Sequence, residues 1–250
     1  MNISTNIIGV DCAAQGRDIG LALGHFDGHE CNVSEVAHGK FLESVADTIA
    51  GWISADERTI LALDAPLGWP VHLGECLFNH RAGEHVAIDS DTLFSRITDK
   101  IVREKTGKKP LEVGADRIAR AARSALNLLN DLRTLTGRPI PLQAVEPIMN
   151  DSVCTIEVYP AATLTVKGFM QPYKKKEYHS GRQKILISLE TQMQISANKS
   201  LIIENDDVLD AVICVLAGVD FLQQNVIIPS GDELECVKKE GWIWVQSPFA

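Results

Sequence analysis

The stretch Ile7-Ile8-Gly9-Val10-Asp11 decides the expected fold of this chain, because it is a short apolar run that ends on a carboxylate. Runs of this kind are typical of strands that are buried on both faces of a sheet. Residues 59–63 form a second apolar run, which ends at Asp64 in the same way. Both runs can lie at the centre of a sheet, so we expect an α/β protein whose middle strands each end at an aspartate.

The segments around these two runs predict a mixed sheet flanked by helices. Residues 19–26 and 31–37 have the pattern of strands, and Asp27-Gly28 between them is a hairpin turn signal. With residues 153–159 as the fifth strand, we expect a five-stranded sheet made of an antiparallel meander and parallel strands. Stripes of apolar residues at helical spacing predict the flanking helices, at residues 41–53, 114–135, 180–196 and 206–223. A last strand is expected near residues 242–245.

The segment after the fourth strand has no long periodicity. Residues 65–113 contain three histidines and several glycines, and a long irregular segment inside a domain is usually functional or mobile. We therefore interpret residues 65–113 as an insertion on the substrate side, with short helices at most. No repeat, low-complexity tract or linker divides the chain, which predicts one domain over residues 1–250.

Composition excludes several classes of protein. The 250 residues are 45% apolar and 23% charged, as in globular proteins. The sequence contains no run of 18 apolar residues, so we do not expect a membrane span. The six cysteines have no metal-site spacing, so we expect reduced thiols in a cytoplasmic protein. The 24 basic and 33 acidic side chains give a net charge of −9, which weakens nucleic-acid binding at long range without excluding it. Oligomerisation stays open.

Four carboxylate positions follow or interrupt apolar runs. Asp11 and Asp64 end strands, Glu157 lies late in the fifth strand, and Asp210 follows Asp207 by three residues on a predicted helix. If these strands are parallel neighbours, their carboxyl ends meet at one edge of the sheet, where ligands bind in open α/β sheets. Clustered carboxylates repel one another, and a hard divalent cation with oxygen ligands relieves that repulsion. Each acid also has a structural alternative, as a turn former or a helix cap.

Six strings of residues resemble, in fixed order, a prokaryotic family of unknown function, domain family 429, which is predicted to contain nucleases of the ribonuclease H-like superfamily. The strings are IIGVDCAAQG (7–16), LALDAPLGWP (61–70), SRITD (95–99), TIEVYPAATL (155–164), NDDVLDAV (205–212) and EGWIW (240–244). The resemblance implies the ribonuclease H-like fold, with a three-stranded meander and two further parallel strands.

The resemblance also implies roles for particular acids. The superfamily has metal-binding acids at the ends of its first and fourth strands, which Asp11 and Asp64 match. The Holliday-junction resolvases carry Asp-x-x-Asp-Ala on their last catalytic helix, and the segment from Asp207 through Ala211, which contains Asp210, has that form. Glu157, Arg96 and Asp99 match only the smaller family, and the long insertion departs from minimal nuclease domains.

Basic residues supply candidates for binding substrate. Residues 173–182 are basic with interleaved aromatic residues, so Lys174 and Lys175 are expected to contact a phosphate backbone, although such a stretch is more often a solvated loop. Further candidates are Arg96, with Asp99 beside it, and Arg117, because a guanidinium group can bind phosphate through bidentate hydrogen bonds. A surface salt bridge is the alternative for Arg117.

These observations predict a divalent-metal-dependent nuclease or other phosphodiester hydrolase with Mg²⁺ or Mn²⁺ as cofactor. Asp11, Asp64, Asp207 and Asp210 are the expected metal ligands, and Glu157 is an additional catalytic candidate. The predicted partner is nucleic acid or another phosphodiester. One alternative is an actin-like, sugar-kinase-type phosphotransferase, which shares a similar first strand but normally needs two such domains around ATP. The other alternative is a non-catalytic binding module on the same fold.

Overall fold

Apolar runs form the strands of one mixed sheet in the computed structural model, which describes residues 4–54, 56–114 and 116–248. The remaining residues of the predicted domain over 1–250 lie outside the described part. The strands are β1 (Thr5–Asp11), β2 (Gly20–Phe26), β3 (Cys31–His38), β4 (Arg58–Asp64), β5 (Val153–Val158), β6 (Gln194–Ile195) and β7 (Ile243–Trp244). Their order across the sheet is β6-β3-β2-β1-β4-β5-β7.

The pairing confirms an α/β fold with a mixed sheet, but the predicted number of strands was wrong. β1, β2 and β3 form an antiparallel meander, while β4, β5 and β7 continue from β1 in parallel. The sheet has seven strands and not five. β7 lies within the expected last strand, whereas β6 pairs in parallel with β3 inside a segment expected to be helical. Two-residue strands such as these depend on tertiary pairing, which a local pattern does not reveal.

The helices fill the connections between these strands. They are α1 (Val45–Trp52), α2 (Val71–Leu77), α3 (Ser90–Phe94), α4 (Ile97–Thr106), α5 (Asp116–Thr136), α6 (Pro160–Val166), α7 (His179–Leu189), α8 (Lys199–Glu204), α9 (Asp206–Leu222) and α10 (Glu233–Glu240). The predicted helices correspond to α1, α5, α7 and α9, although α7 ends earlier than expected, at Leu189. In the described part of the chain, no helix combines the length and the hydropathy that a membrane span requires.

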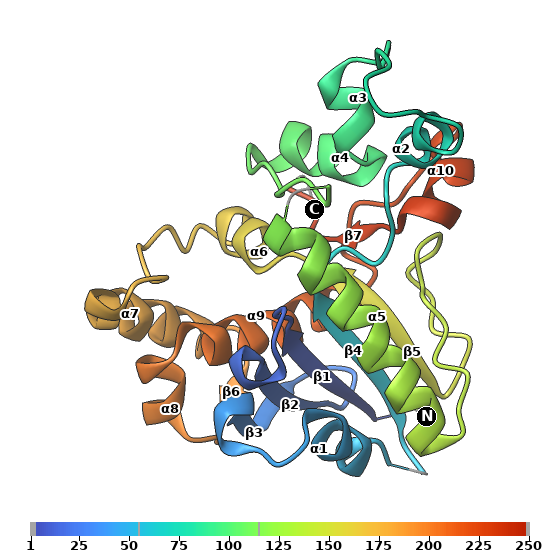
Figure 1. Cartoon of the computed structure of the whole chain (residues 1–250). Coiled ribbons are helices and arrows are strands. Elements are labelled where there is room, and N and C mark those ends of the chain that lie inside the picture. The colour runs from blue at the N-terminus through green and yellow to red at the C-terminus, as the bar shows by residue number, and fades with distance from the viewer. Residues whose placement is uncertain (1–3, 55, 115, 249–250) are drawn as a thin grey trace.

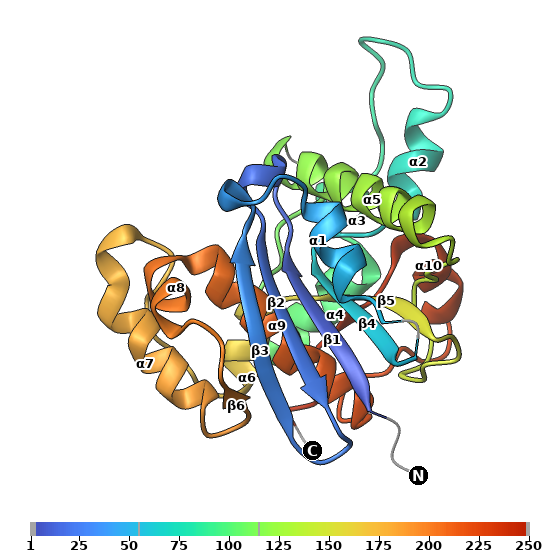
Figure 2. The ribbon, with the colours of Figure 1, turned by 90° about the horizontal axis from the view of Figure 1, so that it is seen from below.

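Helices cover both faces of the sheet, which is why β1 and β4 are apolar without alternation. On β1, Ile7 packs into a core with α9, while Ile8 packs into a second core with α1 and α5. The two layers are visible on opposite sides of the strands (Figures 1 and 2). Burial on both faces explains the continuous apolar runs from which the central strands were predicted.

Two glycines allow α9 to lie unusually close to the meander. A Cβ atom at Gly9 would lie 2.0 Å from the carbonyl oxygen of Ala211, and one at Gly20 would lie 2.0 Å from that of Asp207. Any larger residue at either position would push the helix away. This contact places the first two turns of α9, with Asp210, against the end of β1.

The predicted insertion over residues 65–113 contains three helices, α2, α3 and α4. Figure 1 shows them grouped with α10 and β7 beyond the ends of β4 and β5. α10 packs against both α2 and α4, so this group forms one wall beside the carboxyl ends of the central strands.

Candidate functional site

Two aspartates face each other at the carboxyl ends of neighbouring parallel strands. Asp11 is the register partner of Asp64 between β1 and β4, so the two side chains leave the sheet at the same level. Both residues are partly buried, and they are close enough that each affects the pKa of the other.

Helix α9, which packs on one face of the sheet, adds a third carboxyl group. Asp210 is fully buried, and its negative charge acts on both Asp11 and Asp64. Its Oδ1 accepts a hydrogen bond of 2.8 Å from the Tyr173 hydroxyl, and its Oδ2 pairs with the ammonium group of Lys174. The structure therefore brings the three predicted acids together and gives one of them a cation.

Burial and mutual repulsion raise the pKa values of this acid cluster, which we define as Asp11, Asp64 and Asp210. Burial is the largest cause for Asp11, whose pKa lies well above its usual range, and the charges of Asp210 and Asp64 add to it. Burial followed by the Asp210 charge raises the pKa of Asp64 to about 7. The pKa of Asp210 is also raised by burial, against the opposing effect of Lys174.

Two members of the acid cluster, Asp11 and Asp64, lie on the wall of a cavity of about 560 Å³, a size typical of small-molecule sites. Asp11 and Asp64 line one side, with Lys174 beside them. Residues of the insertion, of α5 and of the chain after β5 line the rest, among them Lys108, Lys109, Leu111, Ile118, Tyr159 and Pro160. The cavity thus combines a polar end at the sheet with a largely apolar remainder.

Glu157 lines the same cavity, but its carboxylate is already occupied. Arg96 donates to it twice, from Nη2 to Oε1 at 2.6 Å and from Nη1 to Oε2 at 2.9 Å, and the Leu67 N–H donates at 3.0 Å. Burial raises the pKa of Glu157, while Arg96 opposes that shift. With this guanidinium as partner, Glu157 does not need a metal ion to balance its charge.

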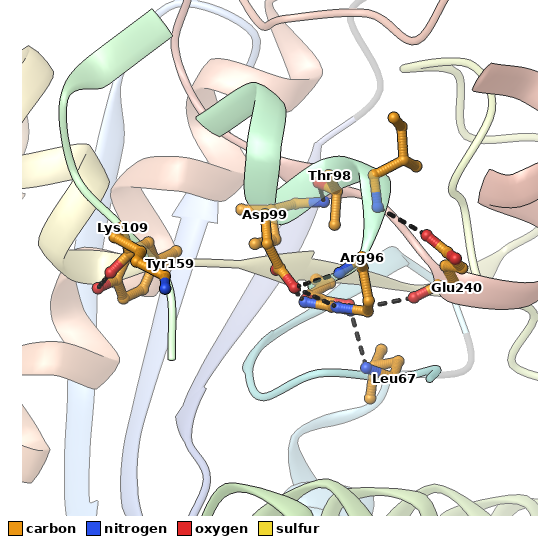
Figure 3. A network of polar contacts seen from close by, with 10 residues as sticks. Leu67, Arg96, Thr98, Asp99, Lys109, Tyr159 and Glu240 are labelled. Atoms are coloured by element: carbon orange, nitrogen blue, oxygen red, sulfur yellow. Dashed lines mark hydrogen bonds and ion pairs between the residues drawn. The ribbon is translucent and has the colours of Figure 1, made fainter. Parts of the chain in front are cut away.

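Arg96 is the centre of a buried polar network that joins the insertion to β5 and α10 (Figure 3). Besides its bonds to Glu157, it donates from Nε and Nη2 to Asp99 and from Nη1 to the Glu240 carbonyl oxygen. A guanidinium group has five N–H donors, and these bonds use all five. Arg96 and Asp99 are both buried, so the network leaves no donor of Arg96 for the predicted contact with a substrate phosphate.

The other predicted residues lie at different distances from the acid cluster. Asp207 contacts the ring of His38 through Oδ2, 3.3 Å from Nε2, and its charge reaches Asp11. Arg117 is an exposed residue of α5 and lines a neighbouring cavity of about 910 Å³. Lys175 is exposed, with its ammonium group 5.8 Å from the centre of the Tyr178 ring. Only Lys174, of these two lysines, lines the cavity of the acid cluster.

Two residues at the site were missed by sequence reasoning. Tyr173 binds Asp210 directly, and buried Arg182 holds the chain around Lys174 through four hydrogen bonds to backbone carbonyl groups. A signal for Arg182 existed, because it precedes Ile185, Leu186 and Leu189 at the spacing of one buried helix face. Tyr173 begins the basic stretch with interleaved aromatic residues over 173–182, but that pattern does not indicate a bond to Asp210.

No group of three or more His, Cys, Asp or Glu side chains within residues 4–54, 56–114 and 116–248 is arranged to hold a metal ion. Within these described residues, ion pairs hold Asp210 and Glu157 but neither Asp11 nor Asp64. Mg²⁺ is commonly bound by only one or two carboxylates, with water and substrate phosphate as its other ligands. The pair of Asp11 and Asp64 fits that mode of binding.

The raised pKa values predict that the metal-free protein loses stability as the pH rises. A carboxyl group with a pKa of about 7 when folded and about 4 when unfolded keeps its proton only in the folded state between these values. The free energy of unfolding should therefore fall between pH 5 and pH 8, by about 2–3 kcal/mol for this one group. Urea unfolding in EDTA at the two pH values measures this change.

Asp64→Asn is the matched control for this pH dependence, because it removes both the titrating group and its repulsion of Asp11. The difference in stability between pH 5 and pH 8 should shrink by more than half in the variant. An unchanged difference would assign the pH dependence to groups outside the acid cluster.

Comparison with known proteins gives one family. The family model described as "Protein of unknown function (DUF429)" matches residues 9–234. This range contains the whole acid cluster, and it contains Arg96, Asp99 and Glu157 of the buried network but not Glu240. No curated protein and no solved structure matches the chain.

Proposed function

We propose that this chain, which belongs to the DUF429 family, is a divalent-metal-dependent nuclease of the ribonuclease H-like superfamily. The observation that carries the proposal is the register pair of Asp11 and Asp64, with Asp210 beside it, at the carboxyl ends of two central parallel strands. Ligand sites of open α/β sheets lie at this edge.

The strand order supports the superfamily assignment. The meander of β1, β2 and β3, continued by β4 and β5 parallel to β1, is the arrangement that the superfamily implies. The first and fourth strands end on Asp11 and Asp64, the two positions at which the superfamily carries metal-binding acids.

The donor set of the pair supports a hard divalent cation. Asp11 and Asp64 offer carboxylate oxygens at the level of the cavity wall, and a bound cation would offset the repulsion that contributes to the raised pKa of Asp11. When bound, Mg²⁺ or Mn²⁺ would activate a water molecule and neutralise charge on a phosphodiester. Asp11 and Asp64 would hold the ion, and Asp210 would act through Lys174 and Tyr173, to which it is bonded.

The cavity supports a substrate that is partly apolar and partly anionic. Its polar end holds Asp11 and Asp64, and the remainder includes Tyr159, Leu111 and Pro160 together with Lys108 and Lys109. A nucleotide has a base with an apolar face and a charged phosphate, so it matches both parts of this surface. The proposed substrate class is therefore nucleic acid, with the scissile phosphate at the acid cluster.

Metal removal tests the proposal directly. We expect the protein to cleave at least one member of a panel of single-stranded DNA, duplex DNA, RNA and branched DNA in Mn²⁺ or Mg²⁺, and to cleave none in EDTA. Gel electrophoresis of labelled strands measures the products. Absence of cleavage across the panel with both metals, or cleavage that persists in EDTA, would refute a metal-dependent nuclease.

A further inference from the structure

Lys174 brings a positive charge into the acid cluster. Its ammonium group pairs with Oδ2 of Asp210, and its charge also acts on Asp11 and Asp64. The side chain is 53% exposed and lines the cavity, while the Asp210 carboxylate that it pairs with is fully buried. Lys174 therefore lies where a cation bound by the three acids would lie.

The chain around Lys174 is fixed in place. Arg182, 1% exposed, donates from Nη1 to the carbonyl oxygens of Tyr173 at 2.6 Å and Lys175 at 2.8 Å, and from Nη2 to that of Lys176 at 3.3 Å. Its Nε donates to the carbonyl oxygen of Ile203, which ties the segment to the end of α8. A buried guanidinium group with these bonds is costly to move, because its N–H groups would lose their partners.

Tyr173 adds a second restraint on Lys174. Its hydroxyl binds Oδ1 of Asp210 at 2.8 Å, and its ring centre lies 5.4 Å from the Lys174 ammonium group, within the range of a cation–π interaction. Both oxygens of Asp210 are thus used by the two consecutive residues. The arrangement leaves Asp11 and Asp64 as the carboxyl groups of the cluster that a metal ion can reach.

Charge balance indicates how many ions this cluster takes. If a bound cation displaces the protons of the cluster, its three carboxylates and the Lys174 ammonium group have a net formal charge of −2, which a single divalent cation cancels. Two divalent cations together with Lys174 would give the site an excess of positive charge before any substrate is bound. Since Lys174 is held in place, the arrangement favours one ion.

We propose that Lys174 takes the place of a second metal ion, so that the site binds one divalent cation on Asp11 and Asp64 while the ammonium group binds a phosphate oxygen of the substrate. This inference rests on the proposed function and concerns the same site. It makes Lys174 a catalytic residue and assigns Asp210, Tyr173 and Arg182 as positioning residues that hold it.

The stoichiometry of Mn²⁺ binding to the full chain tests this inference without any substrate. Titration followed by the EPR signal of free Mn²⁺ should give one ion per parent chain. Lys174→Met should bind two, because it frees Oδ2 of Asp210 and removes the competing charge. Lys175→Met is the matched control, since Lys175 is exposed outside the cavity, and it should bind one ion like the parent.

A second variant guards against loss of the fold. Lys174→Gln keeps a hydrogen-bond donor for Asp210 without the charge, and it should also bind a second ion. Two ions on the parent, or one ion on every folded Lys174 variant, would overturn the role of Lys174. A different outcome would contradict the proposed function: the parent chain would then bind no Mn²⁺ at all.

Discussion

Asp64→Asn is expected to lower metal-dependent cleavage by about 1000-fold or more while the protein stays folded. Asparagine keeps the shape of the side chain but removes the charge that would hold the cation at the end of β4. A bound metal ion contributes several kcal/mol to charge stabilisation in the transition state, and about 4 kcal/mol corresponds to this loss in rate. Single-turnover cleavage rates in Mn²⁺, measured on the panel substrate that the parent cleaves best, provide the comparison.

The stability of the variant separates a catalytic effect from unfolding. Removing one of three mutually repelling acids should leave Asp64→Asn at least as stable as the parent at pH 8, as measured by urea unfolding in EDTA. Asp18→Asn is the control, because Asp18 is an exposed acid that pairs only loosely with Arg17, at 3.6 Å. Parent-like cleavage by Asp64→Asn would exclude Asp64 as a metal ligand.

The central part of the fold could be predicted from sequence because its strands carry their own signals. β1 and β4 are continuous apolar runs that end on aspartates, and helices on both faces of the sheet account for that pattern. A last strand was predicted near β7, but the short strand β6 carries no such signal. It pairs with the distant strand β3 for two residues, so its existence depends on contacts that form only in the folded chain.

The site shows the same division between local and distant information. Asp11 and Asp64 could be placed together because the end of a strand is a local feature and the two strands are neighbours. The partner of Glu157 could not be predicted in this way, since Arg96 lies 61 residues earlier in the chain, beyond an irregular segment. Likewise, the residues from Lys174 to Lys176 look alike in sequence, and the bonds from Arg182 determine which ammonium group reaches Asp210.

Arg96→Met should have the largest effect on stability, a loss of about 3–5 kcal/mol in the free energy of unfolding. Methionine fills a similar space, but it leaves the buried carboxylates of Glu157 and Asp99 without their guanidinium partner. Total stabilities of about 5–15 kcal/mol are usual, so this loss is a large fraction of the whole. Urea unfolding at pH 7 measures it, and Arg96→Met with Glu157→Gln should recover part of the loss.

An exposed pair of the same chemistry separates the effect of burial from that of the ion pair itself. Arg120 and Asp116 are 2.8 Å apart, but both side chains are about three-quarters exposed, at 74% and 76%, whereas Arg96 and Glu157 are 1% and 2% exposed. Arg120→Met should therefore cost less than about 1 kcal/mol. The contrary result would be that Arg96→Met lowers the free energy of unfolding no more than Arg120→Met does, but weakens substrate binding. Arg96 would then be a substrate ligand, as the sequence suggested, and the five-bond network would not hold the insertion against β5.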